Sequence, residues 1–178
     1  SGVMLIDLEK WREQNVESKL LKFITAKNGM IQQGDQGALN HVLCHDIYCF
    51  EPKFNSVTIF YDFTYQEMLI YRKPPKFYTE VEVCEAVENP SIIHFTTSFL
   101  SKRAWMKGCK HQYVGEWLKY KEKSPWKDKE LWDDDRPQCK KIGAEMIRKM
   151  PRNIAVRIAG LMQVYGRPFI NKITLKNT

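Results

Sequence analysis

Gly34-Asp35-Gln36-Gly37-Ala38-Leu39-Asn40 places a carboxylate and a carboxamide between two glycines. An acidic residue directly after a glycine, followed by an apolar pattern that starts at Leu39, predicts the first turn of a helix. Two interpretations remain open from these residues alone. Asp35 is a helix cap and nothing more, or Asp35 and Gln36 hold a polar ligand at the positive end of the helix, where the two glycines permit close approach of the backbone.

Strands and helices alternate on both sides of this stretch. The apolar runs predict buried strands, and apolar residues at helical spacing that stop at Gly, Asn or Pro predict helices. The predicted strands cover residues 3–6, 47–50 and 91–95, and the predicted helices cover residues 8–12, 16–27, 65–71, 79–87, 113–120 and 126–132. Asp7 is expected to cap the first of these helices. The alternation predicts an α/β fold class with a helical C-terminal region appended to it.

Charge is divided unevenly along the chain. The net charge is +7, but residues 1–100 carry 9 Lys+Arg against 13 Asp+Glu, net −4, whereas residues 101–178 carry 19 against 8, net +11. A positive field in the C-terminal part attracts phosphates, nucleic acid or an acidic membrane surface. No apolar run approaches the roughly 20 residues of a membrane span. The first residues contain no initiator Met and no basic segment, so we expect a chain cut from something longer.

The cysteines predict a reducing environment, and therefore a cytoplasmic location. Their number is odd, their spacing has no CxxC pair, and the positions are Cys44, Cys49, Cys84, Cys109 and Cys139. A metal cluster of His41, Cys44 and His45 on one helical face is conceivable, but this spacing matches no usual zinc site. Inward packing of Cys44 is the favoured interpretation.

His94 follows two isoleucines near the end of a predicted strand, with Lys102, Arg103 and Trp105 shortly after it. In open α/β sheets, ligands gather beyond the carboxyl ends of the strands. A neutral imidazole can complete an oxygen-rich divalent metal site, and adjacent cations can hold a diphosphate whose charge grows as it leaves. A half-buried structural histidine is the alternative. The combination favours nucleotide-sugar chemistry.

Three groups of residues, in order, carry a family resemblance: residues 1–12, residues 34–40, and His94-Phe95 with Arg103-Ala104-Trp105. Together they resemble the glycosyltransferase family 8 enzymes, which are retaining, manganese-dependent transferases of the GT-A fold. This family includes bacterial galactosyl- and glucosyltransferases of cell-surface polysaccharides, and glycogenin. The resemblance implies the C-terminal part of a Rossmann-like, mixed-sheet GT-A catalytic domain in residues 1–110. Residues 111–178 would form a basic helical extension.

The resemblance also implies roles for single residues. Asp35 matches the carboxylate that binds donor-sugar hydroxyls, and Gln36 matches the carboxamide that faces the anomeric carbon. His94 matches the histidine that joins an Asp-x-Asp pair on the metal. Lys102 or Arg103 would contact the leaving diphosphate. An oxocarbenium-like transition state and a departing UDP need such groups.

The sequence departs from the family pattern in the third motif. Thr97 occupies the usual Gly of His-x-x-Gly on the diphosphate side, Ala104 stands in the Pro position of Lys-Pro-Trp, and the gap after His94 is longer. The family's Asp-x-Asp lies upstream of the first motif. The run Asp133-Asp134-Asp135 lies downstream and is interpreted as a solvated charge cluster.

The function implied by the resemblance is the transfer of a hexose from UDP-galactose or UDP-glucose, with Mn²⁺, to a cell-surface polysaccharide or lipid-linked saccharide. The fragment alone is expected to be inactive. A non-catalytic remnant is one alternative. A basic nucleic-acid-binding module is another, but no helix-turn-helix, RRM or zinc-finger signature is present, so no nucleic-acid partner is expected.

The last segment, residues 138–178, combines apolar residues at helical spacing with 9 Lys+Arg and one acidic residue, Glu145. Pro151 should divide it into two helices. A basic amphipathic helix can lie on an anionic bilayer, which would make the protein peripheral on the inner face of the cell membrane. Packing of the apolar stripe on the domain is the equally weighted alternative.

Overall fold

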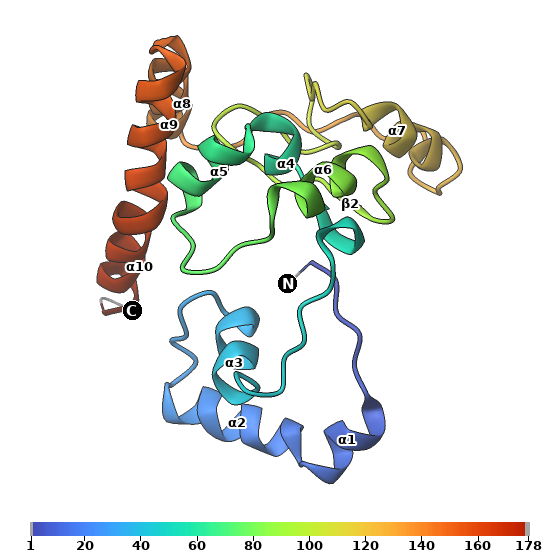
Figure 1. Cartoon of the computed structure of the whole chain (residues 1–178), viewed down its shortest axis with the longest axis vertical. Helices are drawn as coiled ribbons and strands as arrows, with labels where there is room; N and C mark the ends of the chain where they lie inside the picture. Colours follow the sequence, from blue (N-terminus) through green and yellow to red (C-terminus); the bar gives the residue numbers. More distant parts are fainter. Residues whose placement is uncertain (1, 177–178) are drawn as a thin grey trace. The chain divides into compact units, whose positions relative to one another are not determined.

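A computed structural model describes residues 2–176 of the protein, apart from the side chains of residues 140, 172 and 174–176. The chain divides into two compact units: residues 1–50 with 166–178, and residues 51–165. Figure 1 shows the elements of both units along the chain. The division predicted from the sequence is a different one, between a catalytic part in residues 1–110 and an extension in residues 111–178. It stays a prediction.

The first unit begins with two short helices whose ends the sequence encodes locally. α1 (Leu8–Glu13) starts at Asp7, whose carboxylate accepts two backbone N–H groups of the first turn at 3.1 Å, so the predicted cap is confirmed. Asn15 adopts a left-handed conformation, φ 51°, and separates α1 from α2 (Val16–Ala26). Asn and Gly tolerate this region best, which is why the chain turns there.

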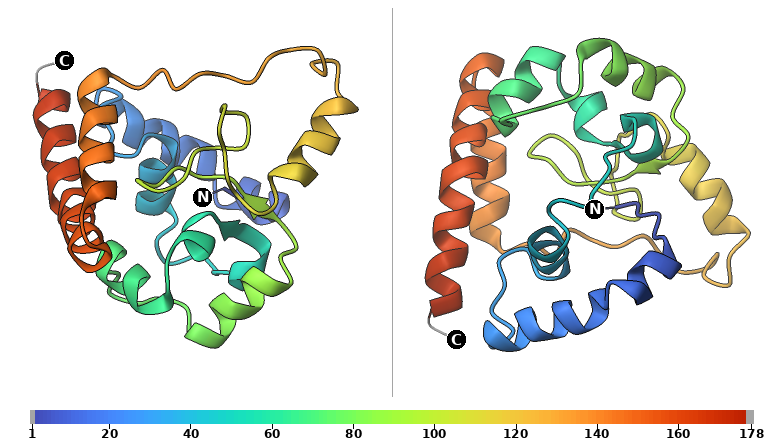
Figure 2. Two further views of the ribbon diagram at one scale, coloured as in Figure 1. Left: turned by 90° about the horizontal axis from the view of Figure 1, so that it is seen from above. Right: turned by 60° about the horizontal axis from the view of Figure 1, so that its bottom comes forward.

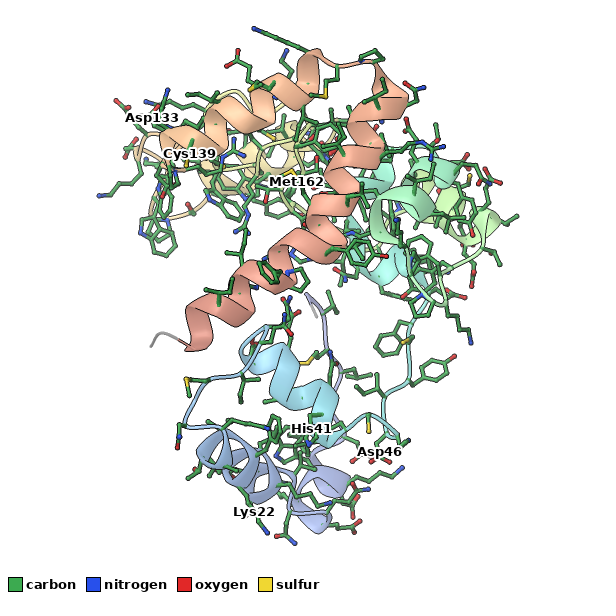
Figure 3. The ribbon with its side chains drawn as sticks, turned by 90° about the vertical axis from the view of Figure 1, so that its left-hand side faces the viewer. Lys22, His41, Asp46, Asp133, Cys139 and Met162 are labelled. Carbon is green, nitrogen blue, oxygen red and sulfur yellow. The ribbon has the colours of Figure 1, made fainter. Side chains whose placement is uncertain are left out.

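α3 (Asp35–Val42) packs against α2 within this unit. The rings of Phe23 on α2 and His41 on α3 are stacked, with centroids 4.0 Å apart and an interplanar angle of 18°. Figure 3 shows His41 on the side of α3 that faces α2. Val16 and Ala38 are the buried residues that these two helices contribute.

Two strand predictions in the first unit are wrong. Residues 3–6 and 47–50 form no strand, and Leu5 is 82% exposed. An apolar run becomes a strand only when a neighbour supplies ladder hydrogen bonds. In the described residues, the strands that pair belong to the second unit.

The second unit is built around a small parallel ladder. β1 (Ser56–Val57) lies beside β2 (Ile93–His94), with Ser56 opposite Ile93 and Val57 opposite His94. The crossover between the strands carries the helices α4 (Ile59–Asp62), α5 (Tyr65–Arg72) and α6 (Glu80–Glu88). Both strand arrows are visible in Figure 2. The structure is therefore a helix-rich α/β arrangement with a small parallel sheet.

α5 and α6 start where local chemistry dictates. Thr64 and Thr79 each form a capping box, in which the threonine side chain accepts from the third helical residue and that residue's glutamate binds the cap backbone. The prediction of these two helices is confirmed. The 3₁₀ turn η1 (Pro52–Asn55) precedes β1.

The core of this unit is aromatic. Met68 is 1% exposed and sits in a cluster with the stacked pair Phe63 and Tyr71, whose centroids are 4.9 Å apart. The remaining buried members are Ile59, Phe60, Val83, Ala86, Val156 and Ala159.

The C-terminal helices supply the last part of this core. α8 (Gln138–Lys149) and α9 (Arg152–Leu161) are separated at Pro151, as predicted. α9 packs against α5 through the small residues Ala155, Val156, Ala159 and Gly160. Arg152 fixes its start by binding both oxygens of Glu67 and the Asp62 carbonyl at 2.6–2.8 Å. The π-turn η2 (Met162–Gly166) then leads to α10 (Arg167–Lys176).

α7 (Val114–Glu122) confirms the helix predicted at 113–120, but the helix predicted at 126–132 is wrong. Trp132 instead forms an isolated parallel bridge with Met106. Its N–H donates to the Trp105 carbonyl at 2.9 Å, and its carbonyl accepts from Lys107 N–H at 2.8 Å. This extended pairing with a distant segment replaces the hydrogen bonds that a helix would form.

Candidate functional site

His94 ends β2 and is held by a partner from the neighbouring segment. Its Nδ1 lies 3.0 Å from Oδ1 of Asn55, the last residue of η1. With the amide oxygen as acceptor, Nδ1 carries the proton and Nε2 keeps its lone pair. The ring is half-buried. In this tautomer Nε2 can accept a hydrogen bond or bind a metal ion.

The protonation state of His94 suits the same role. Burial lowers its pKa below the ordinary 6.5, and the positive charge of Arg103 lowers the pKa further. The neutral form therefore predominates at pH 7. Arg103 and His94 are thus electrostatically coupled within the second unit.

The loop after β2 is fixed to α4. The hydroxyls of Ser98 and Ser101 both donate to the carboxylate of Asp62, Ser98 at 2.6 Å. Thr96 N–H donates to Thr58 Oγ1 at 2.8 Å. These bonds hold the segment that leads from His94 to the basic residues in one conformation.

The two candidate cations of this loop have different surroundings. Lys102 is half-buried and its Nζ donates to the Lys107 carbonyl at 3.0 Å. Arg103 is exposed, and its guanidinium carbon lies 5.2 Å from the ring centroid of Trp105. Thr97, which stands at the family's glycine position, is exposed on the same loop.

Removing the charge of Arg103 should be visible at His94. In Arg103→Ala, the pKa of His94 is expected to rise toward its ordinary value, because the positive charge that contributes to lowering it has gone. The titration of the His94 ring protons by NMR measures the shift. Lys110→Ala, which removes an exposed cation of the same segment, is the matched control. An unchanged His94 midpoint in Arg103→Ala would contradict the coupling.

The GDQGALN stretch lies in the first unit, at the start of α3. Gly34 occupies the N-cap position with φ 58°, and Asp35 is the first helical residue, so the cap interpretation of Asp35 is wrong. Asp35 and Gln36 are both exposed at this end of the helix. A Cβ on Gly37 would overlap the Gln32 carbonyl, so this glycine accommodates the chain's own preceding turn.

Asp35 and Gln36 belong to one unit, and His94, Thr97, Lys102 and Arg103 to the other. The structure brings residues together within each of these two groups. The joint site of all six stays a prediction.

The other candidate metal ligands share no site, and Cys44 is exposed, so its predicted inward packing is wrong. α3 ends at Val42, so His41, Cys44 and His45 share no helical face. Asp133 is exposed and binds Lys107 at 3.2 Å, as expected of a solvated charge cluster. Asp134 departs from this prediction, because its side chain is only 16% exposed and binds Arg136 at 2.6 Å. Among the residues that the structure describes, no group of three or more His, Cys, Asp or Glu could hold a metal ion.

Sequence reasoning missed Asn55 and Asp62, which position His94 and its loop. Asn55 bonds a residue 39 positions away, and Asp62 bonds residues 36 and 39 positions away. Such partners leave no periodic pattern in the sequence. A polar residue two positions before the short β-branched run at 57–59 was the signal available for Asn55.

Comparison with known proteins defines the class of the chain. The sequence profile described as "Glycosyl transferase family 8" matches residues 1–107, more than half of the sequence. The chain belongs to glycosyltransferase family 8. The resemblance of the three motifs is thereby confirmed.

A particular relative is General stress protein A of Bacillus subtilis (strain 168), to which the chain is 31% identical over 128 residues. The match covers 71% of this chain and 41% of the relative, so the chain spans about two fifths of the relative's length. No solved structure matches the chain significantly. Across the described residues, no helix is both long and apolar enough to cross a membrane.

Proposed function

We propose that the chain is the C-terminal part of the catalytic domain of a retaining glycosyltransferase. The enzyme would move galactose or glucose from a UDP-sugar to a saccharide acceptor of the cell envelope. The observation that carries the proposal is His94, which ends a parallel strand, is neutral at pH 7 and is oriented by Asn55. Membership of family 8 supports glycosyl transfer as the reaction class.

The GT-A fold is part of this proposal. Two parallel strands joined by a helical crossover support a Rossmann-like sheet, of which β1 and β2 would be one piece. Residues 1–110 would complete the catalytic domain, and residues 111–178 would be its helical extension.

Each site residue has a proposed task. Asp35 would accept hydrogen bonds from hydroxyls of the donor sugar, and Gln36 would lie beside the anomeric carbon. A carboxamide is a poor nucleophile, so attack from the same face as the leaving group is favoured over a covalent intermediate on Gln36.

The leaving diphosphate needs positive charge. Arg103 is the better placed of the two candidates, because Lys102 is bonded to a backbone carbonyl while Arg103 is exposed and acts electrostatically on His94. Thr97 would add a hydroxyl on the diphosphate side. A guanidinium can bind two phosphate oxygens at once.

The residues present fit a divalent cation at one position. Nε2 of His94 would be one ligand of Mn²⁺, and Asn55 would hold the ring in the tautomer that leaves this nitrogen free. When bound, the ion supplies charge that stabilises the departing UDP. The described residues supply no further cluster of ligands, so the Asp-x-Asp pair would lie outside them.

The direct test is the release of UDP by the intact protein that contains this chain. UDP-glucose and UDP-galactose are offered separately with Mn²⁺ and a mixture of envelope saccharides. Turnover of either donor, abolished by a chelator and restored by Mn²⁺, is expected. Turnover of neither donor would overturn the proposal and favour a non-catalytic remnant.

A peripheral place on the inner face of the cell membrane is proposed for the same enzyme. α8 carries Ile142 and Met146 exposed at 50% and 59%, beside the basic residues Arg148 and Lys149 of its last turn. α9 uses its small-residue face for α5, and Ile147 of α8 packs against the core, which supports the packing interpretation for these faces. The exposed apolar residues of α8 are proposed to meet the membrane.

Binding to anionic vesicles should therefore depend on α8. The double change Ile142→Glu and Met146→Glu is expected to weaken binding to phosphatidylglycerol vesicles by about tenfold, because it removes apolar contact and adds repulsion. Val81→Glu, at an exposed apolar position of α6, is the matched control. Deleting residues 138–178 would also remove Val156 and Ala159 from the core, so point changes are the sharper test. Binding that ignores both salt and the double change would contradict the proposal.

A further inference from the structure

A large open groove lies in the second unit, next to the loop that follows β2. Its volume is about 810 Å³. The loop after β2 forms one side, and α7 with the segment that follows it forms the other. Five aromatic side chains line it: Trp105, Trp117, Tyr120, Trp126 and Trp132.

The aromatic rings of the groove are presented to solvent. Tyr120 is 73% exposed, Trp126 is 64% exposed and Trp132 is 66% exposed. Rings of this size bury about 150–250 Å² when they pack, so leaving three of them exposed in one groove costs apolar contact that a ligand can restore. Their number in one groove distinguishes them from scattered surface apolar residues.

The backbone that carries the rings is held in place. The Ser124 hydroxyl donates to the Lys121 carbonyl at 2.7 Å and accepts from Trp126 N–H at 3.2 Å. Trp132 is bonded to Trp105 and Lys107 on the opposite side. The groove is thus largely formed before a ligand arrives, which reduces the entropic cost of binding.

The charge of the lining is positive. Arg103, Lys121 and Lys129 face one carboxylate, Glu130, among the described lining residues. Arg103 and Trp105 lie on the loop that follows His94, so the groove adjoins the proposed catalytic loop. An anionic group on the ligand is therefore favoured, at a place next to the chemistry.

A polyanion fits less well. The carboxylates of residues 133–135 follow Trp132 directly, and the side chain of Asp133 is 82% exposed although it binds Lys107. A nucleic-acid backbone carries a charge at every residue and would meet these carboxylates. A ligand with a single charged group and otherwise neutral, ring-shaped units avoids them.

We propose that this groove binds the acceptor, a saccharide of several neutral rings that carries one phosphate or carboxylate group. The C–H faces of the sugar rings would stack on Tyr120, Trp126 and Trp132, because the face of an aromatic ring is electron-rich and attracts C–H groups. The anionic group would meet Arg103 or Lys129. The inference rests on the proposed transferase function and adds the class of its acceptor.

The test is a calorimetric titration of the intact protein. The probes are maltohexaose, monophosphorylated maltohexaose, inorganic phosphate and a ten-residue oligothymidylate. The phosphorylated saccharide is expected to bind at least about tenfold more tightly than the neutral saccharide or phosphate alone, since both ring stacking and charge contribute. Equal or tighter binding of oligothymidylate, or no binding of the saccharides, would overturn the proposal.

Variants locate the binding. Trp126→Ala and Trp132→Ala are each expected to weaken binding of both saccharides about tenfold. Loss of one base-stacking aromatic residue in nucleic-acid-binding proteins has an effect of this size. Lys129→Gln should reduce the preference for the phosphorylated form while leaving neutral maltohexaose unaffected. Trp11→Ala, on α1 in the other unit, is the control for loss of an indole. Saccharide binding that all three groove variants leave unchanged would place the acceptor elsewhere.

The outcomes separate this inference from the proposed function. UDP-sugar turnover without saccharide binding in the groove overturns the acceptor site and leaves the transferase in place. Saccharide binding without turnover of either UDP-sugar supports the groove as a saccharide site and overturns the transferase. The experiment therefore distinguishes failure of the acceptor site from failure of the proposed function.

Discussion

Hexose transfer by the intact protein is expected to fall about 100-fold or more when His94 is replaced by alanine. The imidazole is the proposed metal ligand from this chain. The methyl group of alanine has no nitrogen that could bind the metal in its place. The affinity for Mn²⁺, measured by isothermal titration, should fall with the activity. Asp35→Asn is expected to lose transfer as well, but with Mn²⁺ affinity retained, because its proposed role concerns the sugar hydroxyls.

Replacing Asn55, which orients the His94 ring, should have a smaller effect than replacing His94 itself. Asn55→Ala should lower Mn²⁺ affinity or activity by about 10- to 100-fold, the range found for residues that orient a metal ligand. His45→Ala removes an exposed histidine beyond α3 and should change neither quantity. Activity of His94→Ala equal to that of the unaltered protein would remove His94 from the site and, with it, the role of Asn55.

Adding one methyl group to α9 should lower the free energy of unfolding markedly. A Cβ on Gly160 would lie 2.8 Å from the Ile70 carbonyl oxygen and 3.1 Å from the Tyr71 Cα, both backbone atoms of α5. Because backbone cannot move aside as a flexible side chain can, Gly160→Ala is expected to destabilise the protein by about 1–3 kcal/mol. Urea unfolding with an unchanged m-value measures the loss.

Gly143 in α8 provides the matched control for this change. No atom lies within 4 Å of a Cβ built there, so Gly143→Ala gains the helix propensity of alanine without a clash. It should stabilise the protein by up to about 1 kcal/mol. The same substitution on two neighbouring helices thus has opposite expected signs. A neutral or stabilising Gly160→Ala would show that α5 and α9 do not approach as closely as the structure has them.

Local chemistry explains which elements could be predicted. Asp7 caps α1, and the capping boxes at Thr64 and Thr79 start α5 and α6, because each signal lies within about four residues of the bond that it makes. Pro151 divides α8 from α9 for an equally local reason. The strands predicted at 3–6 and 47–50 and the helix at 126–132 failed, because pairing with distant residues decides whether such segments form regular structure.

The sequence by itself determined the family, the order of the three motifs and the candidates Asp35, Gln36, His94 and Arg103. Only the tertiary structure decided what surrounds them. It set Asn55 against His94, fixed the loop to Asp62 and placed Trp132 beside Trp105 to form an aromatic groove. These partners lie 27 to 39 residues apart. Periodicity and capping act over a few residues, whereas such contacts exist only once the core that joins α4, α5 and α9 has formed.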